Sequence, residues 1–219
     1  MLPTVMLTVN ASGAAAAAKN GQVVVVVDLI DMSTTCEAAL DAGALAIFGA
    51  APDNARCPVA TNPEQIGIIA GNKAVAEQTD IVVIAEPRVG SDAERLSSVS
   101  QLIKGIEKSG SRVGAVLPNI GSETAKLTDL RGRIVVAATG TGGVAFDAAV
   151  TAGAPAVLTA TVARTMQKKG VAPANAGVER AVATARQLKT GIAVVAASAN
   201  SLEDILAAEY IIKQIITTW

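Results

Sequence analysis

The sequence predicts an α/β fold, a three-layer α/β/α arrangement with a mostly parallel central sheet. Short apolar runs alternate along the chain with alanine-rich stretches of helical length. One run, residues 23–27, is five consecutive valines followed by Asp28, a pattern typical of a strand buried on both faces. Such alternation produces a parallel sheet with helices on both of its faces. Because no linker interrupts the 219 residues, we expect one domain over residues 1–219.

Each element follows from this alternation. The predicted strands are the apolar runs at residues 23–27, 44–48, 81–84, 113–117, 134–138, 156–158 and 192–196. The predicted helices lie between or after them, at residues 33–42, 64–78, 93–108, 144–152, 174–188 and 202–217. The alanine run at residues 14–18 is expected to start or extend a further helix, which Asn20 and Gly21 would end.

The composition excludes several classes of function. With 18 basic and 19 acidic residues the net charge is −1, which argues against a polybasic surface for nucleic acid or lipid. Aromatic residues make up only 2 % of the chain, so few rings are available to stack on bases. There is no histidine, which removes Ser-His-Asp and Cys-His catalysis and zinc sites built on imidazole. We therefore expect neither a nucleic-acid partner nor a membrane partner.

The remaining composition points to a cytoplasmic protein. Cys36 and Cys57 are too few for a disulfide framework and are expected to be free thiols in a reducing compartment. The first ten residues have neither the charged region nor the long apolar region of a signal peptide. The apolar share of 51 % is compatible with a homo-oligomer.

Polar residues follow three of the predicted strands, and the carboxyl ends of parallel strands are where ligands bind in such folds. We expect these three ends to converge at one edge of a single sheet. The first begins at Asp28 and continues with Asp31, Ser33, Thr34 and Thr35. A carboxylate followed by hydroxyls at a helix start can hold a divalent cation and a phosphate together. The alternative is that Thr34 and Glu37 form a capping box and that Asp28 only ends a strand.

The second strand end is rich in glycine and threonine: Thr139, Gly140, Thr141 and Gly142. It fits part of the dinucleotide fingerprint, but residues 148–177 contain no acid to bind a ribose, so no dinucleotide is expected. The loop is interpreted as a backbone nest for one phosphate or carboxylate, or else as a tight turn. Arg88, which follows another predicted strand, would neutralise an anion or pair with Glu86.

The third strand end leads into the last predicted helix. Ser201 and Asp204 have capping-box spacing, and acids in a first helical turn stabilise a helix without any further role. Local evidence therefore favours a structural role for this segment.

Taken together, the three segments resemble the Mg²⁺-dependent 2-phosphosulfolactate phosphatases of coenzyme M biosynthesis. Residues 28–32 (Asp-Leu-Ile-Asp-Met) align with that family's Asp-Val-Leu-Arg-Ala, which precedes a helix start rich in Ser and Thr. Residues 137–143 (Ala-Ala-Thr-Gly-Thr-Gly-Gly) are similar to its Thr-Thr-Asn-Gly-Thr-Arg-Ala. Residues 201–209 (Ser-Leu-Glu-Asp-Ile-Leu-Ala-Ala-Glu) match its closing Ser-Leu-Glu-Asp-x-Leu-Ala-Ala-Gly, the most specific of the three.

The resemblance implies a Mg²⁺-dependent phosphohydrolase acting on a small anionic substrate, a phosphorylated acid. Metal ligands or bases would be Asp28, Glu203 and Asp204, with Asp31 as a further catalytic candidate. Substrate would be bound by Ser33, Thr34, Thr35, Thr139, Gly140, Thr141, Gly142 and Arg88.

Two arginines of the family pattern are replaced, by Asp31 and Gly142, and this disfavours a doubly anionic substrate. Two alternatives therefore stand beside the phosphatase. One is a non-catalytic member of the fold that binds a metabolite or a partner subunit. The other is an enzyme acting on a less anionic substrate, with Asp31 as a second metal ligand.

Overall fold

Two parallel sheets of four strands each form the framework of the molecule, and the computed structural model describes residues 4–219. The first sheet has the strand order β1-β8-β2-β7 and the second has the order β3-β6-β4-β5. The strands are β1 (Val5–Val9), β2 (Val23–Val27), β3 (Ala46–Ala50), β4 (Ile81–Ala85), β5 (Val113–Pro118), β6 (Ile134–Ala138), β7 (Val157–Thr159) and β8 (Ile192–Ala196). Every neighbouring pair is parallel.

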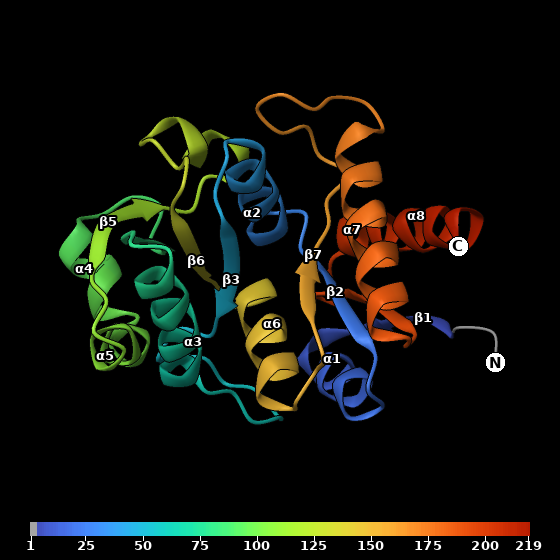
Figure 1. Ribbon diagram of the computed structural model, residues 1–219, viewed down its shortest axis with the longest axis horizontal. Coiled ribbons are helices and arrows are strands. Elements are labelled where there is room, and N and C mark those ends of the chain that lie inside the picture. Colours follow the sequence, from blue (N-terminus) through green and yellow to red (C-terminus); the bar gives the residue numbers. More distant parts are fainter. Residues whose placement is uncertain (1–3) are drawn as a thin grey trace.

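Helices follow the strands in the order that the alternation predicts. They are α1 (Asn10–Lys19), α2 (Met32–Asp41), α3 (Pro63–Ala76), α4 (Asp92–Ser97), α5 (Ser100–Lys108), α6 (Gly142–Thr151), α7 (Ala172–Leu188) and α8 (Leu202–Thr218), with a 3₁₀ helix η1 (Gly121–Lys126). Each sheet has helices on both faces, so the predicted three-layer α/β/α class is confirmed (Figure 1).

One helical layer is shared by the two sheets. Figure 1 shows α2 and α6 between the β3–β6 side and the β2–β7 side of the molecule. Side chains of α1, α2 and α6 pack with Val24 and Val26 of β2 and with Val135 and Ala137 of β6 in one continuous core. The alternate residues of β2 face α7 and α8 instead, while those of β6 face α3 and α5.

The expectation of a single sheet is therefore wrong, and α2 and α6 explain why. Every residue of the segments Met32–Ala39 and Gly142–Ala149 is buried, so these parts of the two helices are covered on all sides. A helix without a solvated face has to be covered all round. A sheet on either side provides that cover.

Two local predictions also differ from the structure. The helix expected at residues 93–108 is two helices, α4 and α5. The Ser98 hydroxyl donates to the Arg95 carbonyl, and the carboxylate of Asp53 accepts the backbone N–H groups of Ser100 and Gln101 at the start of α5. The edge strand β1 was not predicted. Across residues 4–219, none of the helices combines the length and apolarity needed to cross a bilayer.

Candidate functional site

The carboxylate of Asp28 lies where the first turns of two helices meet. Asp28 ends β2 in the first sheet, and Thr141 and Gly142 begin the helix that follows β6 in the second. Asp28 Oδ2 accepts hydrogen bonds from Thr141 Oγ1 at 2.7 Å and from the Gly142 backbone N–H at 2.6 Å. The backbone N–H of Met32, in the first turn of α2, also donates to it. The side chain thus occupies an anion position at two helix N-termini.

Burial has the largest effect on the pKa of the Asp28 carboxyl. The residue is 1 % exposed, and desolvation raises the pKa of its carboxyl above the ordinary value, while the three donors act in the opposite direction.

Asp204 is a second buried carboxylate next to Asp28. It lies in the first turn of α8, after β8, which pairs directly with β2. Its Oδ1 accepts the backbone N–H of Leu29 at 2.8 Å, and Ser201 caps the helix by accepting the backbone N–H of Asp204. Burial, with a contribution from the Asp28 charge, raises the pKa of Asp204 to about 6. Two interacting carboxyl groups therefore lie at adjacent strand ends, although Asp204 also belongs to the predicted cap.

The hydroxyls of Ser33 and Thr34 are engaged within the loop between β2 and α2. Ser33 Oγ accepts from the Asp28 backbone N–H and donates to the Val26 carbonyl, both at 2.9 Å. Thr34 Oγ1 donates to the Leu29 carbonyl at 2.7 Å and contacts the Thr161 hydroxyl at 2.9 Å. These two side chains hold the turn that positions Asp28.

Thr35 and Thr139 are likewise buried and bonded internally. Thr35 Oγ1 donates to Asn119 Oδ1 at 2.6 Å, and Thr139 Oγ1 accepts the Gly143 backbone N–H at 2.8 Å. Of the residues expected to surround a phosphate on these two loops, Gly140 and Thr141 are the ones that reach solvent.

Asp31 and Arg88 form an ion pair across the two sheets. Asp31 precedes α2, and Arg88 lies in the loop after β4. The Asp31 side chain is 10 % exposed and that of Arg88 is 49 % exposed. Arg88 therefore brings a guanidinium to the start of α2, where the resembled family has its own arginine.

Gly142 has no room for a side chain. A Cβ at this position would lie 2.4 Å from Asp28 Oδ2 and 2.9 Å from Met32 Cβ. The arginine that the resembled family has here is incompatible with this packing. Gly140, by contrast, has open space around it.

Glu203 is set apart from the two buried carboxylates. Successive residues of a helix point about 100° apart, and while Asp204 is buried Glu203 is exposed. Glu203 lines an apolar groove of about 440 Å³ together with Leu29, Leu206 and Tyr210. The structure does not unite Asp28, Glu203 and Asp204: residues 4–219 contain no group of three or more Asp, Glu, Cys or His side chains that could hold a metal ion.

Several polar residues of this region were not singled out from the sequence. Asn119 and Thr161 follow β5 and β7, and both contact the hydroxyls described above. The rule that polar residues after parallel strands converge would have identified them. Buried Glu37 is paired with Arg180 of α7 and accepts from the Thr159 hydroxyl, which the proposed capping box with Thr34 did not foresee.

The two cysteines are free, as expected. Cys36 lies in the core of α2, and burial raises the pKa of its thiol far above the usual range.

Comparison with protein-family models gives no match, and no curated protein matches the chain significantly.

Proposed function

We propose that the chain is a Mg²⁺-dependent phosphohydrolase that acts on a small phosphorylated acid, as the resemblance to 2-phosphosulfolactate phosphatases implies. The observation that carries the proposal is the pair of buried carboxylates, Asp28 and Asp204, after neighbouring strands β2 and β8. Buried carboxylates with raised pKa values at the carboxyl ends of parallel strands are typical of functional sites.

The donor set at these strand ends suits Mg²⁺. In phosphate-transferring sites this ion is commonly held by one or two carboxylates, with water and substrate oxygens completing its shell. Asp28 and Asp204 offer such oxygens, and three protein ligands are not required. When bound there, Mg²⁺ would draw negative charge from the phosphoryl oxygens of the substrate.

The surrounding residues would hold this arrangement in place. Thr141 and the Gly142 backbone fix the Asp28 carboxylate through their hydrogen bonds, and Leu29 fixes Asp204. Arg88 offers a half-exposed guanidinium that can bind phosphate oxygens, and Asp31 positions it. Asp204 ionises as pH rises through about 6, and an ionised carboxylate binds a cation more strongly, so cation binding should strengthen over that range.

A second candidate is a non-catalytic protein of the same fold that binds a metabolite or a partner subunit. A specific observation favours it: the hydroxyls of Ser33, Thr34, Thr35 and Thr139 all bond within the protein. On this account Asp28 is itself the anion that the two helix N-termini bind, and no substrate phosphate is needed there.

Phosphate release from a panel of small phosphorylated carboxylic acids, 2-phosphosulfolactate included, distinguishes the two candidates. Assays would run with Mg²⁺, with Mn²⁺ and with a chelator. The phosphohydrolase predicts metal-dependent turnover that falls at least about 100-fold in Asp204→Asn, the loss expected when a charge acting in the transition state is removed. The exposed Glu179→Gln on α7 is the control. Absence of turnover by the folded wild-type protein on the whole panel leaves the binding protein as the better account.

A further inference from the structure

A cavity of about 610 Å³ lies at the opposite end of the first sheet from Asp28. Thr4, Gln22 and Gly191 immediately precede β1, β2 and β8, and all three line it. Because these strands are parallel, their amino ends share one edge, while Asp28 and Asp204 follow the carboxyl ends. This volume is within the range of small-molecule sites.

Gln22 gives this cavity a buried polar group without a partner. The residue is 5 % exposed, and its Oε1 atom has no hydrogen-bond partner among residues 4–219. Buried acceptors are nearly always satisfied, because leaving one unpaired costs free energy. Rotation of the terminal amide, whose last torsion is soft, would present this oxygen to the cavity and to an N–H or O–H donor there.

Two basic side chains lie on the rim of the cavity. They are Arg186 and Lys189, at the end of α7, and none of the described lining residues has an acidic side chain. Lys189 adopts a left-handed backbone conformation with φ +55°, and it ends α7 directly at the cavity. Arg186 is already bonded to the backbone oxygens of Thr218 and Trp219, so Lys189 is the cation that remains for an anionic ligand.

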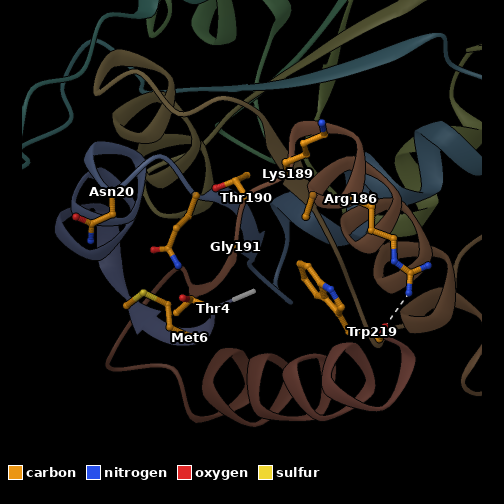
Figure 2. Close-up of a pocket in the computed structure, with 10 residues that line it drawn as sticks. Thr4, Met6, Asn20, Arg186, Lys189, Thr190, Gly191 and Trp219 are labelled. Carbon is orange, nitrogen blue, oxygen red and sulfur yellow. Dashed lines mark hydrogen bonds between the residues drawn. The ribbon is translucent and has the colours of Figure 1, made fainter. Parts of the chain in front are cut away.

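Trp219 contributes a flat aromatic wall. Arg186 donates hydrogen bonds to the carbonyl oxygens of Thr218 and Trp219, which ties the end of α8 to the end of α7. Figure 2 shows the indole of Trp219 lying between Thr4 and Arg186. Aromatic faces of this kind stack on planar ligands.

We propose that this cavity binds a small planar carboxylate that carries an N–H or O–H donor. Lys189 attracts the carboxylate, the indole stacks on the ring, and Gln22 Oε1 accepts from the donor. The site is separate from the strand-end carboxylates, so it stands or falls independently of the proposed phosphohydrolase.

Trp219 is the only tryptophan of the chain, so its fluorescence reports on this cavity alone. The probe is 4-hydroxybenzoate, titrated by calorimetry and by tryptophan fluorescence. Three comparators each lack one feature: benzoate lacks the donor, 4-hydroxybenzamide lacks the charge, and 4-hydroxycyclohexanecarboxylate lacks the flat ring. We expect saturable binding of the probe with a matching fluorescence change, and about tenfold weaker binding of each comparator.

Two variants locate the binding. Gln22→Met keeps the size of the side chain and should bind benzoate and 4-hydroxybenzoate equally, a loss of discrimination that general destabilisation would not produce. Lys189→Asn removes the charge but places a residue there that tolerates left-handed backbone. It should weaken the binding of both benzoate and 4-hydroxybenzoate about tenfold. Lys213→Gln, exposed on α8, is the matched control. The proposal is overturned if no probe binds the wild-type protein saturably up to about 5 mM, or if Gln22→Met and Lys189→Asn bind like the wild type.

Discussion

The Asp28 carboxylate accepts a 2.6 Å hydrogen bond from the backbone N–H of Gly142, and this contact joins the end of one sheet to the helix that follows the other. The two residues are 114 positions apart in the chain. The geometry of the strand ends therefore depends on how closely Asp28 and Gly142 approach each other. The absence of a side chain at Gly142 permits that approach.

Gly142→Ala should therefore be strongly destabilising. The added Cβ would lie 2.4 Å from Asp28 Oδ2, and backbone and carboxylate would both have to move. We expect a loss of about 2–4 kcal/mol in the free energy of unfolding, measured by urea denaturation. Gly140→Ala, two residues away with open space around it, should change stability by less than about 1 kcal/mol. Equal effects of the two substitutions would contradict the packing described.

Asp204→Asn should stabilise the protein at neutral pH in metal-free buffer. Because the folded-state pKa of Asp204 is about 6, above the unfolded value of about 3.9, the folded protein binds this proton more tightly. Wild-type stability due to this group therefore falls as pH rises from ~4 through ~6. Asparagine does not ionise, so the variant does not lose stability in this way as pH rises. Its amide oxygen can still accept the hydrogen bond of the Leu29 N–H.

The measurement is urea denaturation of both proteins in a chelator at several pH values. The variant should gain roughly 1–2 kcal/mol over the wild type at pH ~7.5, and the gain should vanish towards pH ~4. A difference between the two proteins that does not vary with pH would show that the Asp204 proton is not linked to folding.

Thr35→Val should destabilise the protein, because it removes the hydroxyl that donates a hydrogen bond to Asn119. Both residues are 1 % exposed, so the substitution leaves the Asn119 amide oxygen buried and unpaired. We expect a loss of about 1–3 kcal/mol in thermal or urea unfolding. Combining it with Asn119→Leu should cost less than the sum of the two single substitutions. Strict additivity would argue that the two side chains do not depend on each other.

Arg180→Gln should be among the most damaging single changes outside the strand ends. It leaves Glu37, which is 4 % exposed, without its cation, and burial already raises the pKa of that carboxyl. We expect a loss of about 3–5 kcal/mol. Arg112→Gln breaks an ion pair in which the arginine side chain is 81 % exposed, and it should have a much smaller effect on stability, because solvent screens the pair. Chemical denaturation of both variants and of the wild-type protein measures the two changes in the free energy of unfolding.

Most of the fold can be predicted from the sequence, because the patterns that indicate each strand and helix are local. Unbroken valine runs such as Val23–Val27 predict buried parallel strands, and the structure has them at those residues. The number of sheets is not a local property. Helix α6 is buried on all sides, and only the packing of two sheets against it accounts for that burial. The sequence signal for such burial is a helix that lacks the polar face of a surface helix.

The candidate site was predictable in part for the same reason. Polar residues after parallel strands were expected to meet, and Asp28 meets Thr141 and lies next to Asp204. Which hydroxyls remain available to a ligand depends on partners far along the chain. Thr35, for example, is occupied by Asn119, 84 residues away, and no spacing rule reveals that pairing.

We propose that Asp28 and Asp204 together hold a divalent cation at the strand ends, and Mn²⁺ binding followed by electron paramagnetic resonance tests this most directly. We expect one bound Mn²⁺ per chain at pH ~7.5, which Mg²⁺ displaces and which binds more weakly at pH ~5. Binding should be lost in Asp204→Asn and retained in Glu203→Gln, because Glu203 is exposed in the neighbouring groove. A folded wild-type protein that binds no Mn²⁺, or one whose binding survives Asp204→Asn, would contradict the claim.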